Sequence, residues 1–218
     1  MKGLLIKDFK LMKNQKNFFF IMIFIAAAML FAEFESTFVV SYFTMIASMF
    51  VLSTISYDEY DNGYAFLFSM PFSRTSYVKE KYVFSILVGG GAWLLSVVLS
   101  GILITIRNPQ ISVMDWLPID LLYICIVLLF AAVMIPVQLK FGGEWGRVAL
   151  LLTVGVAVLG SMGVIKLLEI LQVDLDAVLA SMSTMNMMQI GGAAGIFSVV
   201  LLAISYRISC RVMKNKEF

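Results

Sequence analysis

The sequence predicts an all-α integral membrane protein, because of its composition and the length of its apolar runs. Apolar residues make up 61% of the 218 residues and charged residues only 14%, and the mean hydropathy is +0.96. A soluble domain has about a quarter of its residues charged. The apolar runs are about 15 to 25 residues long, too long for core strands, so we expect helical spans rather than a barrel of short strands.

Six such runs predict six transmembrane helices in a single transmembrane domain, residues 1–218. They lie at residues 18–35, 37–56, 82–106, 118–138, 147–168 and 189–207. An even number of spans places both ends of the chain on one side. Of the 16 Lys and Arg residues, only Arg107 and Lys166 fall on the other side. The positive-inside rule therefore places both termini in the cytoplasm.

An interfacial helix is expected at residues 1–17, before the first span. Leu5, Phe9 and Met12 recur there at helical spacing among several lysines, which is typical of a basic amphipathic helix lying on the inner membrane surface. The alternative is a signal peptide, with the lysines as its charged region and residues 18–32 as its apolar region.

A second amphipathic helix is expected outside the membrane, at residues 169–188. Four methionines lie at or near its end, and thioether sulfur is a ligand that suits copper(I). Methionine at helical spacing is more often an apolar packing residue, so we expect no metal site. The methionines are Met182, Met185, Met187 and Met188.

The longest polar interval, residues 57–81, lies between the second and third expected spans. Tyr57, Tyr60, Tyr64 and Phe68 are spaced so that a helix over residues 57–70 carries them as one aromatic stripe. Pro71 ends this helix, because proline lacks an amide proton and disfavours helix in the residue before it. Ser73 is placed to cap the next helix.

Small residues at close spacing let transmembrane helices approach one another. We expect them to serve packing within the subunit, with a subunit interface as the alternative. They are Gly89 to Gly91, Ser96 with Ser100, and Gly191 with Gly195.

The sequence excludes several classes of activity, and no catalytic residue is expected. The chain contains no histidine, no phosphate loop of the form GxxxxGK[ST] and no HExxH motif. No charged residue lies in the middle of an expected span, which argues against an ion-coupled carrier. Cys125 lies in a span and Cys210 in the tail, so they predict no disulfide framework.

The inner loop also carries a recognisable run of residues: Asp58-Glu59, Gly63, Leu67 to Arg74, Tyr77-Val78 and Lys81-Tyr82. This run resembles the inner loop of ABC-2 permeases, with Met70 where that pattern has leucine. The resemblance covers nearly the whole chain, since these permeases also have a flat basic entry helix, six spans, an inner coupling helix and an external helix. The chain is most similar to small bacterial peptide exporters, including those for phenol-soluble modulins.

The resemblance implies a permease subunit of an ATP-driven exporter in the bacterial plasma membrane, moving amphipathic peptides or lipid-like molecules outward. It implies a separate ABC ATPase that binds ATP and Mg²⁺, a second permease copy or paralogue, contact with membrane lipids, and no nucleic acid. This chain would have no nucleotide site, no enzymatic activity and no cofactor of its own. The residues expected to dock on the ATPase are Asp58, Glu59, Tyr60, Gly63, Tyr64, Leu67, Phe68, Pro71 and Arg74.

Two alternatives stay open on the sequence alone. The chain is a membrane scaffold or sensor if the same loop docks a cytosolic protein that is not an ATPase. The aromatic stripe is only an anchor in the lipid interface if the loop docks nothing.

Overall fold

The computed structural model describes residues 2–32, 34–60, 63–107, 110, 116–142, 166 and 187–216, and every regular element in those ranges is a helix. The all-α prediction is confirmed for this part of the chain. The helices in chain order are α1 Lys2–Asn14, α2 Lys16–Phe31, α3 Ser36–Glu59, α4 Gly63–Ser69, α5 Arg74–Arg107, the helix Trp116–Gly142, and α8 Met187–Asn215.

Four helical segments in the described ranges are long and apolar enough to cross a membrane. They are Thr37–Glu59, Arg74–Arg107, Trp116–Gly142 and Gln189–Asn215, and a fifth results if α1 and α2 together form one bent span. The chain is thus a multi-pass membrane protein. The expected span 147–168 and nearly all of the external helix 169–188, with Met182 and Met185, lie outside the described residues, so the number six stays a prediction.

The N-terminal part of the chain forms two helices, and whether they are an entry helix and a first span stays a prediction. α1 and α2 meet at Gln15 with a bend of 64°. The apolar face of α1 packs on the protein, since Leu4 is buried and the Phe9 ring lies edge-on to Phe84 at 5.3 Å. α1 is therefore held by α5 as well as by its own amphipathic pattern.

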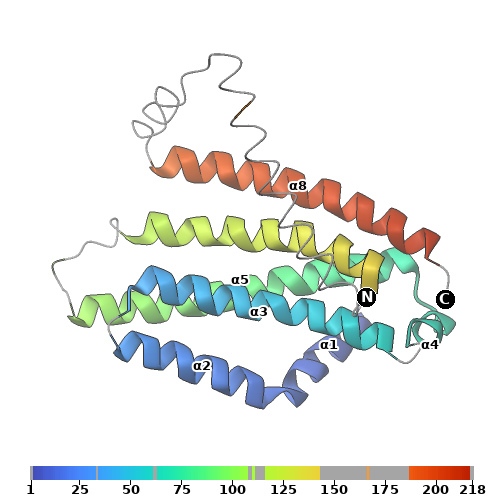
Figure 1. Ribbon diagram of the computed structural model, residues 1–218, viewed down its shortest axis with the longest axis horizontal. Coiled ribbons are helices and arrows are strands. Elements are labelled where there is room, and N and C mark those ends of the chain that lie inside the picture. Colours follow the sequence, from blue (N-terminus) through green and yellow to red (C-terminus); the bar gives the residue numbers. More distant parts are fainter. Residues whose placement is uncertain are drawn as a thin grey trace.

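The start of α1, all of α4 and the end of α8 lie at one end of the bundle, here called the α4 end (Figure 1). α3 runs antiparallel to α5 and is its main partner. A core at the α4 end joins these helices and includes Leu4, Ile55, Tyr64, Leu67, Tyr77, Ile135, Leu139 and Met213. A second core joins α2, α3 and α5 and includes Met22, Phe43, Phe50 and Phe84.

Hydroxyl groups attach α8 and the helix Trp116–Gly142 to the rest of the bundle. Tyr82 Oη of α5 lies 2.6 Å from Ser205 Oγ and 2.8 Å from Ser209 Oγ of α8. Ser205 in turn donates to the Ala132 carbonyl. Buried hydroxyls are stabilising only when they are hydrogen-bonded, so these contacts fix how the helices face one another.

α5 approaches its neighbours closely at Gly89. A Cβ atom added there would lie 2.6 Å from Val127 Cγ1 and 2.8 Å from Ser48 Oγ. A Cβ atom on Gly91, which is exposed, would meet no described atom within 4 Å. The expectation that small residues serve packing within the subunit is therefore confirmed at Gly89.

We expect Gly89→Leu to lower the free energy of unfolding by about 1 to 3 kcal/mol, the usual effect of overpacking a filled core. Gly91→Leu is the matched control and should not destabilise the protein, because leucine forms helix better than glycine. Unfolding of the two purified variants in detergent measures the difference. Equal stability would contradict the close approach at Gly89.

Candidate functional site

The polar loop holds two helical segments rather than one. α3 continues through Tyr57 and ends at Glu59, Tyr60 has a non-helical conformation with φ −57° and ψ 138°, and α4 begins at Gly63. The single helix predicted over residues 57–70 is therefore wrong. The start of α4 lies close to the end of α3, since a Cβ atom on Gly63 would lie 2.6 Å from the Asp58 carbonyl oxygen. The predicted stripe is split, with Tyr57 and Tyr60 on one side of the break.

The boundaries after α4 agree with the sequence. α4 ends at Ser69, two residues before Pro71, and α5 begins at Arg74. Ser73 accepts a hydrogen bond from the Ser76 amide at 3.1 Å, as an N-cap residue does. The predicted cap is confirmed.

The inner face of α4 packs on the protein itself. Tyr64 and Leu67 are buried, and Phe68 packs against the same core. The Tyr64 ring lies edge-on to Tyr77 at 5.8 Å and stacks on Phe68 at 6.1 Å. Burial raises the pKa of the Tyr64 phenol, so this side chain stays neutral. A helix of seven residues is not stable alone, so these contacts hold α4 in place.

The outer face of α4 is exposed. Ala65, Phe66, Ser69 and Met70 follow one another at helical spacing on this face, and 69% of Phe66 is accessible. We call these four residues the α4 outer face. Exposed aromatic surface at the end of a bundle is typical of a contact with another molecule. Phe66 was not among the predicted docking residues, although its spacing of four from Met70 was a signal.

The structure gathers the nine predicted docking residues at the α4 end but turns most of them inward. Tyr60 and Pro71 are exposed. Tyr64, Leu67 and Phe68 hold α4, and Gly63 lets α4 start close to the end of α3. The charged members Asp58, Glu59 and Arg74 contact other parts of this chain.

Beneath α4 lies a group of charged side chains that we call the ion cluster: Lys7, Asp8, Asp58, Glu80 and Lys81. Lys81 of α5 is fully buried and pairs with Asp8 of α1 and, at 2.8 Å, with Asp58 near the end of α3. Lys7 also pairs with Asp58. The cluster therefore ties together three helices that are distant in sequence.

Polar neighbours complete the ion cluster. Lys81 Nζ donates to Thr54 Oγ1 at 3.1 Å, and Tyr77 Oη donates to Asp58 Oδ2 at 3.0 Å. Tyr77 also contacts Tyr64, so the cluster and α4 share a neighbour. A buried charge is tolerated only when it is paired and hydrogen-bonded, so each helix must hold its position for Lys81 to stay buried.

A match to a known family extends over almost the entire chain. A model of the family described as ABC-2 family transporter protein matches residues 3–214. The chain belongs to the ABC-2 transporter family. No curated protein and no solved structure was found to match it. The family resemblance of the inner loop is thereby confirmed, whereas the small six-span subtype stays a prediction.

ABC-2 membrane subunits typically work with a separate ABC ATPase and carry no ATPase of their own. The matched range includes α1, the ion cluster, α4 and nearly all of α8. Most of the α4 end thus lies within the part of the chain that matches the family.

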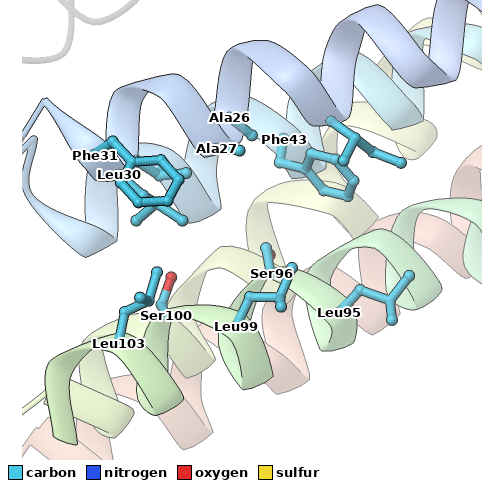
Figure 2. A pocket seen from close by; sticks show the side chains of 12 residues that line it. Ala26, Ala27, Leu30, Phe31, Phe43, Leu95, Ser96, Leu99, Ser100 and Leu103 are labelled. Atoms are coloured by element: carbon cyan, nitrogen blue, oxygen red, sulfur yellow. The ribbon is translucent and has the colours of Figure 1, made fainter. Parts of the chain in front are cut away.

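This ABC-2 chain also has an apolar cavity of about 340 Å³ between α2, α3 and α5, toward the opposite end of the bundle. In Figure 2, Ser100 and Leu103 of α5 point across the gap toward Leu30 and Phe31 of α2. Among the described residues, no charged side chain lines the cavity. Its walls therefore suit an apolar molecule rather than an ion.

We expect Lys81→Met to lower the free energy of unfolding by about 3 to 5 kcal/mol, because it removes the buried cation of Asp8 and Asp58 and leaves them only the partly exposed Lys7. Lys79→Met is the control, since Lys79 is exposed on the same helix, and its effect should stay within about 0.5 kcal/mol. Chemical unfolding in detergent gives both values. Lys81→Met as stable as Lys79→Met would show that the cluster does not hold the fold.

Proposed function

We propose that this chain is the permease subunit of an ATP-driven ABC exporter and that the α4 outer face docks on the separate ATPase. The observation that carries the proposal is a short helix whose inner face is anchored and whose outer face is apolar and exposed. An exposed aromatic side chain that fits a pocket on a partner is typical of binding hot spots. Phe66 of α4 and Met70, directly after α4, fit this role.

The ion cluster is the proposed route from the ATPase to the spans. Asp58 ends α3, Lys81 lies in the second turn of α5, and Asp8 lies in α1, so a displacement of the α4 end moves three helices together. Rigid-body rotation of packed elements is a known way for a local contact to become a global change. In this proposal ATP and Mg²⁺ bind the partner, and this chain binds no cofactor.

The proposed orientation places the α4 end in the cytoplasm of a bacterial cell, with both termini on that side of the plasma membrane. Basic residues concentrate at that end, whereas Arg107 ends α5 at the other. A second permease copy or paralogue completes the transporter, and lipids cover the remaining apolar faces.

The proposed substrate is an amphipathic peptide or a lipid-like molecule moved outward. The support is the apolar cavity between α2 and α5, which takes an alkyl chain or an apolar side chain without leaving a charge unpaired. A scaffold or sensor that docks a protein other than an ATPase is the alternative. Copurification with a protein that carries a phosphate-loop motif favours the exporter, and its absence favours the alternative.

We expect Phe66→Ala to weaken binding of the ATPase about thirtyfold, the effect of truncating a hot-spot aromatic that contributes about 2 kcal/mol. The stability of the isolated chain should not change, because the ring is exposed. Phe31→Ala, equally exposed at the other end of the bundle, is the control. Pull-down with the ATPase measures the affinities, and equal binding by both variants would remove the α4 outer face as the docking site.

We expect Ala27→Trp to fill the cavity and to lower transport in vesicles about tenfold while leaving ATPase binding unchanged. Ala28→Trp is the matched control, because Ala28 is exposed on the same helix and does not line the cavity. Equal transport by the two variants would show that substrate does not pass through this cavity.

A further inference from the structure

Lys216, directly after α8, contacts three other elements. Lys216 Nζ lies 2.9 Å from Glu59 Oε1 at the end of α3 and donates to the Leu139 carbonyl at 3.1 Å. It also lies 5.0 Å from the centre of the Tyr64 ring of α4. A cation at the carbonyl end of a helix, beside a carboxylate and over an aromatic face, is favoured by all three neighbours.

Arg74, the first residue of α5, in turn binds the carbonyl groups at the end of α8. Its Nη1 donates to the Met213, Lys214 and Lys216 carbonyls at 3.1, 2.7 and 2.8 Å. The Met213 and Lys214 carbonyls lie in the last turn of α8, where carbonyls have no partner within the helix, and Lys216 directly follows α8. The Arg74 guanidinium lies 5.9 Å from the centre of the Phe68 ring. We call these contacts of Lys216 and Arg74 the α8 clasp.

The α8 clasp places one cation over each ring of the inner face of α4. Tyr64 and Phe68 are four residues apart on that face and stack on each other. Lys216 covers the first ring and Arg74 the second. Because the end of α8 carries Lys216 and also holds Arg74, both contacts depend on the same short segment.

We propose that the α8 clasp is a positioning device for α4 and that Lys216 is its positioning residue. The clasp is separate from the ion cluster and lies nearer the surface: 21% of the Lys216 side chain and 28% of the Glu59 side chain are accessible, whereas Lys81 is fully buried. Loss of Lys216 therefore loosens α4 without removing the charges that hold the bundle. This inference rests on the proposed docking of α4 for its effect on the ATPase.

The test compares Lys216→Met with Lys214→Met, which removes a charge from the same end of α8 but from an exposed side chain. A spin label at Ser69→Cys, in a Cys125→Ser, Cys210→Ser background, reports the mobility of α4 with no ATPase present. We expect Lys216→Met to raise this mobility and to weaken ATPase binding about fivefold, the size of a modest coupling between two sites. Lys214→Met should change neither value.

Four further variants separate the charge of Lys216 from its bulk. Lys216→Arg should keep both values near those of the unmodified protein, because arginine retains the cation. Glu59→Lys and Lys216→Glu should each loosen α4, and the double variant should recover much of the loss because it restores an opposite pair. Recovery of this kind is not expected if Lys216 only fills space.

The outcomes distinguish this inference from the docking proposal. Unchanged mobility of the label in Lys216→Met would overturn the α8 clasp, whatever the ATPase does. Raised mobility with unchanged ATPase binding, while Phe66→Ala still weakens binding, would overturn the positioning role and leave the docking proposal intact. If neither Lys216→Met nor Phe66→Ala affects binding, docking through α4 is wrong and the positioning role falls with it.

Discussion

The arrangement of the α4 end depends on one buried cation, the Lys81 ammonium. Asp8 and Asp58 reach it from α1 and α3, and both carboxylates are almost completely buried. Moving an unpaired ammonium from water into the protein costs several kcal/mol even after relaxation. Lys81 can pair with both carboxylates only when α1, α3 and α5 keep their relative positions. The cluster therefore specifies how these helices are arranged more than it adds net stability.

α4 depends on that arrangement because its own length gives it little stability. Tyr64 and Leu67 enter a core that includes Leu4 of α1 and Tyr77 of α5, and Tyr77 donates to Asp58 of the ion cluster. A force on α4 is thus applied to a packed unit rather than to a loose loop. The apolar cavity lies toward the other end of α5, so a tilt of that helix would connect the two regions.

Some features could be predicted because their causes are local. The length of the apolar runs predicts the helices, Pro71 predicts the end of α4, and Ser73 predicts the start of α5. The break after Glu59 was missed because the spacing of the aromatic residues alone suits one continuous helix. The ion cluster was missed because Asp8 and Lys81 are 73 residues apart. The only local signal of the ion cluster was Asp8, the one acidic residue among the lysines of residues 1–17.

The most direct measurement is hydrogen–deuterium exchange of α4 in Asp8→Asn, with Lys10→Asn as the control on the exposed face of α1. Exchange reports local opening of hydrogen-bonded backbone. If the ion cluster holds the α4 end together, Asp8→Asn raises the exchange rate in α4 as well as in α1 and leaves α2 unchanged. Exchange in α4 equal to that of Lys10→Asn would contradict the cluster as the link between α1 and α4.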